Sequence, residues 1–382
     1  MRTRQKLEDL ERLTLERYAV RSSESRGRLH PEGESAFRTV FQKDRDRVLH
    51  TGAFRRLEYK TQVFFNTQGD YYRTRLTHTL EVAQVGRTVA RAIGVNEDLT
   101  ETIALSHDLG HPAFGHAGER ILNELMRGHG GFDHNKQSFR VVTQLEKRYP
   151  DFRGLNLSWE TLEGIVKHET EYDIADASEF EPTWRASLEA QIANIADETA
   201  YNAHDLDDGL RSGLLEPAQL TEVRIYQRMC ATLGLNPYAL SELERRVLIR
   251  ELLGFVITDI VQTTTARIAQ HNIQTLEDVR DASSALVGHS ADVAEELQEL
   301  KKFLYANFYY HYRVMRQVHK AEHILTGLFK AFTSRPSMLP PSFLARVSEV
   351  GLECVVCDYI AGMTDRFAMD EYNRLFEPYE AT

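Results

Sequence analysis

A helical hydrophobic pattern that recurs through nearly the whole chain constrains the fold most. Over residues 74–93 the apolar side chains recur at helical spacing, and Gly94 is a typical helix stop. Asn96 is a good N-cap for the next helix, which we expect to end near residue 108. Further helices are expected at 37–60, 116–126, 134–149, 159–169 and 182–204, and over most of the chain after residue 216.

Strand signals are few. Residues 61–65 form one short β-like run, and residues 66–70 carry a turn signal. Pro182 occupies a position typical of the first turn of the helix expected at 182–204. The pattern therefore predicts an all-α fold.

The charge balance limits the partners. The chain of 382 residues has a formal net charge of -11, which argues against nucleic acid as a main partner. Residues 1–60 carry 15 Lys and Arg against 10 Asp and Glu, so their net charge is +5 and the remainder carries -16. The basic N-terminal segment could serve phosphate binding, a subunit contact or neither.

Cysteine usage and hydropathy suggest a location. Three cysteines do not make a disulfide framework, and the lone pair Cys354 and Cys357 fits two buried thiols on one helix face. The sequence has no signal-peptide pattern and no apolar run of transmembrane length. We therefore expect a cytoplasmic protein without membrane association.

Residues 105–122 gather side chains suited to metal binding and acid–base chemistry. The stretch contains His107, Asp108, His111, His116 and Glu119. Imidazole nitrogen and carboxylate oxygen both bind first-row divalent ions. Each histidine alone would be read as a surface or hydrogen-bonded core residue, so a metal site needs further ligands.

Two further candidates lie on strongly predicted helices. His78 and Asp197, with His107 and Asp108, would give two nitrogen and two oxygen ligands and leave positions open for water or substrate. Such a set suits Mn, Fe, Co, Ni or Zn, and Mg less well because of the imidazoles. Sequence distance does not establish that these helices meet.

Beyond the ligands, the surrounding residues resemble a known family. A histidine, a His-Asp pair about thirty positions later and an Asp on a later helix resemble the HD superfamily of metal-dependent phosphohydrolases. The matching segments span residues 38–207 and 358–368, and closely resemble the bacterial deoxyguanosine-triphosphate triphosphohydrolase family. They read FRRLEYKTQVF, RTRLTHTLEVAQVGR, HDLGHPAFGHAGE, FDHNKQSFR, IADETAY and DYIAGMTDRFA.

The resemblance implies an all-helical HD fold and a reaction. The family hydrolyses a deoxynucleoside triphosphate to the deoxynucleoside and intact inorganic triphosphate, with a divalent cation for which Mn²⁺ and Mg²⁺ are the first candidates. It also implies a homo-oligomer, a tetramer or a hexamer. We expect a basic arm over residues 1–36, an HD catalytic core over 37–210 and a helical part over 211–382 that packs on it as one continuous domain.

Residue roles follow from the same resemblance. His116 would transfer a proton, and Glu119 would orient its imidazole and raise its proton affinity. His111, which we group with these two catalytic residues, and His134 match histidines that line the phosphates. His78, His107, Asp108 and Asp197 match the family's metal ligands.

Tyr201 and Asp205 follow Asp197 at i+4 and i+8, so the three share one helix face. By resemblance Tyr201 packs where a 2′-hydroxyl would sit, and Asp205 accepts from the 3′-hydroxyl. Gln62 matches a further 3′-hydroxyl contact. Without the resemblance, Tyr201 would be read as a core aromatic.

Cationic and aromatic side chains are expected beside the triphosphate and the base. Arg75 matches a family phosphate contact, and Lys167 is the second candidate. Arg55 and Arg56 are weaker candidates, because surface or interface roles fit them equally well. Tyr309 and His311 would lie near a base or phosphate subsite.

The chain departs from the family pattern in two respects, and two alternative functions remain. Some family members have a lysine directly after the last metal-ligand Asp, where this chain has Glu198, and we find no added regulatory domain. The alternatives are another HD-type nucleotide phosphohydrolase, which removes phosphates singly or acts on a monophosphate, and a nucleotide-binding regulator without turnover. dGTP is the first substrate to test, since the sequence does not determine the base.

Overall fold

The computed structural model of this chain describes residues 1–63, 72–168 and 180–378. Within them the regular structure is helical, and the β-structure is confined to isolated bridges such as that between Thr61 and Thr74. The all-α prediction is confirmed. Of the expected strand and turn over 61–70, residues 64–70 lie outside the described residues. Each helix among the described residues is too short or too polar to cross a membrane.

The chain forms two compact units, each assembled from three separate stretches. Unit 1 comprises residues 1–49, 78–107 and 155–311, and unit 2 comprises 50–77, 108–154 and 312–382. These boundaries differ from the divisions after residues 36 and 210 that the sequence suggested. The expected N-terminal arm is part of unit 1, and the chain passes from unit 1 to unit 2 between His107 and Asp108.

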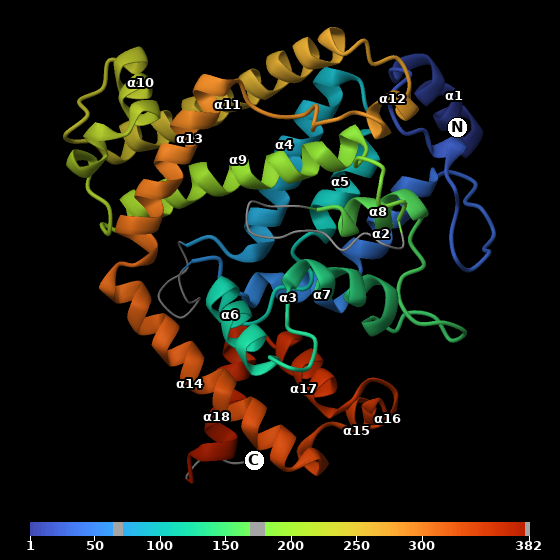
Figure 1. The fold of residues 1–382 in the computed structure, drawn as a ribbon, viewed down its shortest axis with the longest axis vertical. Helices are drawn as coiled ribbons and strands as arrows, with labels where there is room; N and C mark the ends of the chain where they lie inside the picture. The colour runs from blue at the N-terminus through green and yellow to red at the C-terminus, as the bar shows by residue number, and fades with distance from the viewer. Residues whose placement is uncertain (64–71, 169–179, 379–382) are drawn as a thin grey trace. The chain divides into compact units, whose positions relative to one another are not determined.

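Unit 1 is organised around α9, a helix of 24 residues (Leu188–Arg211). It contacts α5 (Glu97–Ser106), α8 (Trp159–Val166), α11 (Glu242–Gln270) and α13 (Ala291–Leu304) (Figure 1). Small residues on its buried face, including Ala193, Ala196 and Ala200, allow this close packing. The other helices of unit 1 are α1 (Arg4–Thr14), α2 (Val40–Leu49), most of α4 (Arg75–Ile93), α10 (Arg224–Leu233) and α12 (Leu276–Arg280).

Helix starts follow the capping residues. The Oδ1 atom of Asn96 accepts a hydrogen bond from the Leu99 N–H at 3.1 Å, as predicted for the N-cap of α5. The prediction for α9 was wrong at its start. The helix does not begin at Pro182, because the Ser187 hydroxyl caps it by accepting from the Ala190 N–H at 3.3 Å.

Two other helix predictions were too long. The helix expected at 37–60 is divided into α2 and α3 (Gly52–Arg56), because the Thr51 hydroxyl accepts from the Phe54 N–H and caps α3. The helix expected at 134–149 is α7 (His134–Arg140) followed by a π-helical segment, η4 (Val141–Leu145).

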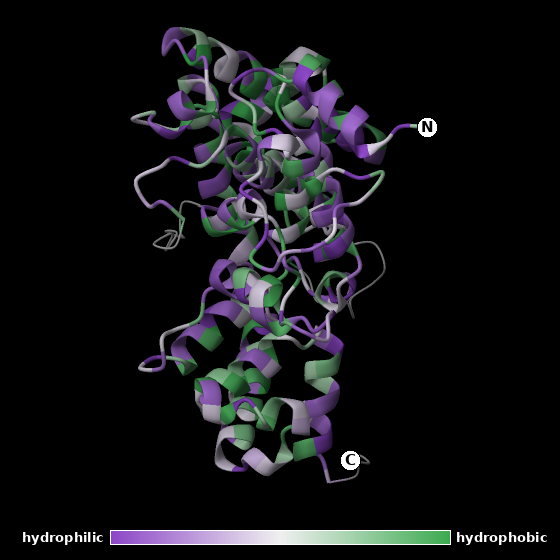
Figure 2. Ribbon diagram, turned by 90° about the vertical axis from the view of Figure 1, so that its right-hand side faces the viewer, coloured by the Kyte–Doolittle hydropathy of each residue, from purple (hydrophilic) through white to green (hydrophobic). Residues whose placement is uncertain are grey.

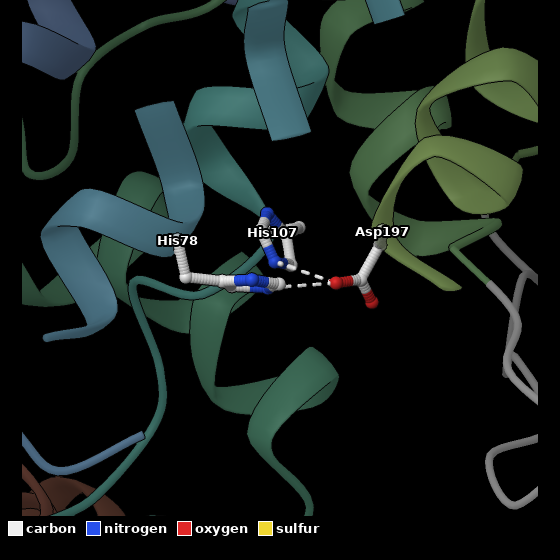
Figure 3. Close-up of side chains that lie close together, drawn as sticks. All are labelled: His78, His107 and Asp197. Carbon is white, nitrogen blue, oxygen red and sulfur yellow. Dashed lines mark hydrogen bonds and ion pairs between the residues drawn. The ribbon is translucent and has the colours of Figure 1, made fainter. Parts of the chain in front are cut away.

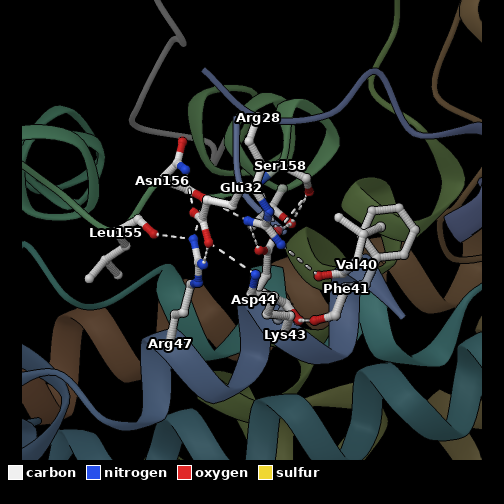
Figure 4. Close-up of polar contacts among 12 residues, drawn as sticks. Arg28, Glu32, Val40, Phe41, Lys43, Asp44, Arg47, Leu155, Asn156 and Ser158 are labelled. Carbon is white, nitrogen blue, oxygen red and sulfur yellow. Dashed lines mark hydrogen bonds and ion pairs between the residues drawn. The ribbon is translucent and has the colours of Figure 1, made fainter. Parts of the chain in front are cut away.

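Buried and partly buried charges tie the N-terminal segment to the rest of unit 1 (Figure 4). Arg28 pairs with the fully buried Asp44, whose other oxygen accepts from the N–H and the hydroxyl of Ser158. Glu32 pairs with Arg47 and with Lys43. This part of the expected basic arm is therefore ordered by paired charges rather than left as a solvated extension.

Unit 2 packs around α14 (Tyr312–Ser334), which contacts α6 (Gly115–Leu125), α17 (Leu352–Ala361) and α18 (Asp365–Phe376). Two one-turn helices, α15 (Pro341–Leu344) and α16 (Val347–Val350), precede α17. Cys357 is buried in this core and Cys354 is partly buried beside it. Hydrophobic and hydrophilic residues alternate along the helices of each unit, as amphipathic packing requires (Figure 2).

Candidate active site

Unit 1 brings together three of the four predicted metal ligands (Figure 3). His78 comes from α4, His107 follows the last residue of α5, and Asp197 lies on α9. The Oδ1 atom of Asp197 lies 2.8 Å from Nε2 of His78 and 3.6 Å from Nε2 of His107. Their ligand atoms all lie within 4.8 Å of one another, close enough to share one ion.

The hydrogen bonding of His107 fits a metal ligand. Its Nδ1 lies 2.6 Å from the carbonyl oxygen of Ala104, which can only accept, so Nδ1 carries the proton. Nε2, the other ring nitrogen, then faces Asp197. A protein carbonyl that fixes the tautomer in this way is the usual support of a metal-binding histidine.

The charge state of Asp197 also fits. Burial raises its pKa, but the charge of His107 and the hydrogen bonds of His168 and His78 outweigh that effect and hold the pKa well below its usual range. The side chain is therefore a carboxylate at neutral pH. The two buried histidines and the partly buried Asp197 offer two nitrogen donors and one anionic oxygen, which suits a divalent cation.

His168 is a member of this site that the sequence analysis missed. It is buried, its Nε2 lies 3.8 Å from Oδ2 of Asp197, and its ring centroid lies 5.5 Å from that of His107. His78 approaches one oxygen of Asp197 and His168 the other. The sequence signal was the His directly after Lys167, which reads as one more polar residue at a helix end.

Unit 2 contains the fourth predicted metal ligand and most of the predicted acid, base and phosphate residues. Asp108, the fourth predicted ligand, accepts from Nη1 of the buried Arg75 at 2.9 Å and lies 3.4 Å from Nε2 of His111. The rings of His111 and His134 are stacked with their centroids 3.9 Å apart. The charge of Arg75 is thus neutralised by the Asp108 carboxylate. His111 contacts both Asp108 and the ring of His134, so it links them.

Glu119 links two histidines of unit 2. Its Oε1 lies 2.7 Å from Nδ1 of His134, and its Oε2 lies 3.3 Å from Nδ1 of the half-exposed His116. Burial raises the pKa of Glu119, but the charges and hydrogen bonds of His134 and His116 hold it far below its usual range. Glu119 therefore stays ionised and orients both rings. His111, Glu119 and His134 also form a second group close enough to hold a metal ion.

The predicted sugar-reading residues lie together in unit 1. The rings of Tyr201 and Tyr309 are nearly parallel with centroids 6.0 Å apart, and the Tyr309 hydroxyl donates to Asp205. The remaining sugar candidate, Gln62, is a buried residue of unit 2 whose Oε1 has no hydrogen-bond partner among the described residues.

Two other candidates lie in different surroundings. Lys167 is buried, and its ammonium donates to Glu163 at 2.9 Å and to the carbonyl oxygens of Glu181 and Trp184. The N–H groups of the Lys167 ammonium thus bind backbone carbonyl groups of unit 1 and one carboxylate. His311, which follows a π-helical turn, donates its backbone N–H to Phe308 and is partly exposed.

Known proteins match almost the whole chain. A deoxyguanosinetriphosphate triphosphohydrolase-like protein from Geobacter sulfurreducens is 52% identical over 98% of both chains. One from Deinococcus deserti is 53% identical over 99% of this chain and 98% of its own length. The chain belongs to the deoxyguanosinetriphosphate triphosphohydrolase-like family. The family model of the HD domain matches residues 75–202, and that of a phosphohydrolase-associated domain matches residues 287–374.

This membership places the two clusters in a hydrolase of the HD type. The matched HD-domain segment runs from Arg75 past Asp197 and so contains the whole His78, His107 and Asp197 group. HD domains bind divalent cations, which agrees with the donor set. A crystal structure of a hypothetical protein from Aquifex aeolicus covers 87% of this chain and 71% of that one at 16% identity. Its TM-score of 0.39 supports no further conclusion.

Proposed function

We propose that the protein hydrolyses deoxynucleoside triphosphates between the 5′ oxygen and the α-phosphorus, releasing the deoxynucleoside and inorganic triphosphate. The name that the relatives share supports dGTP as the first substrate to test. The observation that carries the proposal is one face of α9. Asp197, Tyr201 and Asp205 follow one another there at four-residue intervals. A metal ligand and two candidate sugar contacts therefore share one face, each about 6 Å from the next along the helix axis.

The His78, His107 and Asp197 group would hold the cation, and Asp108, the next residue in the chain after His107, is the proposed fourth ligand. A divalent cation at this position would stabilise the negative charge that develops on the α-phosphate oxygens. Mn²⁺ and Mg²⁺ are the first candidates. Mixed nitrogen and oxygen donors also suit Fe, Co, Ni and Zn.

The half-exposed His116 is the proposed proton donor. The nucleoside 5′ oxygen is a poor leaving group unless it is protonated, and His116 is accessible enough to meet it. Glu119, held ionised by two histidines, orients the His116 ring through its contact with Nδ1. Water supplies the oxygen that the α-phosphorus gains as the bond to the 5′ oxygen breaks. His116 gives its proton to that 5′ oxygen, and the proton that the water releases restores His116.

The remaining unit 2 residues would bind the triphosphate. The stacked His111 and His134 present two imidazoles, and Arg75 holds Asp108 in a buried ion pair. In unit 1, Tyr201 would exclude a 2′-hydroxyl, while Asp205, whose carboxylate already accepts from Tyr309, would accept from the 3′-hydroxyl. Gln62 would add a 3′-hydroxyl contact, and Tyr309 and His311 would line the base. Since its donors are engaged with the protein, Lys167 has no part in this scheme.

Product analysis tests the proposal. The purified protein is incubated with each of the four dNTPs and with GTP, in Mn²⁺ and separately in Mg²⁺, and the products are resolved by ³¹P NMR and chromatography. Deoxynucleoside and triphosphate in equal amounts are expected. Successive release of single phosphates would establish the alternative HD phosphohydrolase, and nucleotide binding without any product would favour a regulator. Light scattering on the same sample tests the predicted tetramer or hexamer.

A further inference from the structure

Unit 2 contains a cavity of about 310 Å³ that none of the proposed catalytic residues lines. Its walls come from α3 and the residues after it, from Leu109 and Gly110, from α7, η4 and the two residues after η4, and from α15, Arg346 and the end of α17. All of these belong to unit 2, and Figure 1 shows α3, α7 and α17 near one another. The volume is at the lower end of the range for small-molecule sites.

The charged side chains of the wall are mostly cationic. Arg56, Lys60, Lys147 and Arg346 line the cavity, against the acids Glu146 and Asp358. The Asp358 carboxylate is already shared, because it accepts from Arg346 at 2.9 Å and from Arg140, outside the cavity, at 2.7 Å. The cavity therefore has an excess of positive charge that its own acids do not neutralise.

Two of these cations, Arg56 and Lys60, have N–H groups that the protein does not fully use. They lie four residues apart, and the buried Nε of Arg56 has no hydrogen-bond partner among the described residues. Burial lowers the pKa of Arg56 more than the charge of Glu146 raises it. The Lys60 ammonium donates to the carbonyl oxygens of His111 and Ala361, which uses two of its three N–H groups. Burial lowers the pKa of Lys60 to about 7, so its third N–H is present in the protonated form that a bound anion favours. Both side chains thus keep donor capacity for an anion.

The rest of the wall is apolar. Leu109, Val141, Leu145 and Phe343 contribute hydrocarbon surface beside the cations. An inorganic ion would leave that surface exposed to water, so burying it favours a ligand with an apolar body. Arginine and lysine together with few acids favour a phosphate over a neutral head group.

We propose that this cavity is a binding site for a small organic phosphate, whose anionic group is held by Arg56, Lys60 and Lys147 and whose body packs on Leu109, Val141 and Phe343. The site is separate from the triphosphate contacts proposed above and does not depend on the proposed hydrolysis.

Phenylphosphonate is a suitable probe, because its carbon–phosphorus bond resists hydrolysis and its ring fits the apolar wall. Its binding to the full chain, stripped of divalent cations with EDTA, is measured by isothermal titration calorimetry. Arg56→Gln should weaken binding about tenfold or more, because a charge-assisted contact is lost. Arg55→Gln is the matched control, since the exposed Arg55 donates to His50 and does not line the cavity.

Two further arms keep the test decisive. The exposed Lys147 can be changed without disturbing the core, so Lys147→Gln should weaken binding even if Arg56→Gln fails to fold. Methylphosphonate, which lacks the ring, should bind more weakly than phenylphosphonate. Equal binding of the two probes would overturn the organic part of the proposal. Binding unaffected by Lys147→Gln and Arg56→Gln, or no saturable binding, would overturn the site.

Discussion

The Oδ1 atom of Asp197 lies 2.8 Å from Nε2 of His78, although 119 residues separate them in the chain. The contact is possible because α4 and α9 pack within the same unit, and it places a carboxylate and an imidazole where one ion can bind both. His107 completes the group from the end of α5. The account of this protein depends on that site holding a divalent cation.

His107→Ala is predicted to remove the bound metal and the activity together, because it takes away one of the three grouped donors and leaves His78 and Asp197 of that group. Metal content after gel filtration, measured by inductively coupled plasma mass spectrometry, checks this. His319→Ala, at an exposed position on α14, is the matched control and should keep the metal. Full occupancy in the His107 variant would remove His107 from the ligand set.

His168→Ala is predicted to weaken metal affinity about 10- to 100-fold without abolishing it, because the variant loses a partner that orients Asp197. Competition with a fluorescent chelator gives the affinity. If His168 only fills space, the variant should melt at a lower temperature with its metal affinity unchanged, and the positioning role would be wrong.

The difference between Lys167 and His168 shows where sequence reasoning ends. Capping and helix stops are local, so Asn96 and Gly94 could be placed from the chain alone, and the motifs pointed to His78, His107 and Asp197. Which of two adjacent polar residues faces a site depends on the packing of α8 against α9, which no local pattern encodes. The same holds for Lys60, whose partner Ala361 is 301 residues away.

His116→Ala is predicted to keep the metal and to lower kcat about a hundredfold or more, since proton transfer by a positioned group contributes that much. His116 is not one of the grouped donors His78, His107 and Asp197, so its loss should leave the metal bound. Steady-state kinetics and metal analysis of one preparation check the lowered kcat and the retained metal. A near-normal kcat would exclude His116 as the proton donor.

Tyr201→Ala is predicted to raise turnover of GTP relative to dGTP, because the ring that would exclude a 2′-hydroxyl is lost. The ratio of kcat/KM values for the two nucleotides is the readout. Tyr238→Ala is the control, because Tyr238 is a unit 1 tyrosine that is 67% exposed, and the variant should leave the ratio unchanged. If the Tyr201 variant discriminates like the wild type, the sugar is read by other residues.

Glu189, in the first turn of α9, gives a prediction for stability against pH. It is fully buried, accepts from the N–H groups of Val20 and Asn96, and burial raises its pKa from 4.5 to about 7 despite those hydrogen bonds. The folded protein therefore holds a proton that the unfolded chain has released between those pH values. The contribution of Glu189 to the free energy of unfolding falls as pH rises through this window.

Glu189→Gln removes that ionisation and keeps an oxygen that can accept. Its stability relative to the wild type should rise between about pH 5 and pH 8, by about 1–3 kcal/mol. Urea unfolding of both proteins at the two pH values provides the measurement. A difference that stays constant with pH would show that Glu189 does not titrate in this range.

Hydrolysis of dGTP in H₂¹⁸O tests the central proposal most directly, because it reports which bond is attacked. Attack at the α-phosphorus puts the label into the released triphosphate and leaves the 5′-hydroxyl of deoxyguanosine unlabelled, and this is the predicted result. Label in orthophosphate, or in the deoxynucleoside, would contradict the account and point to another bond.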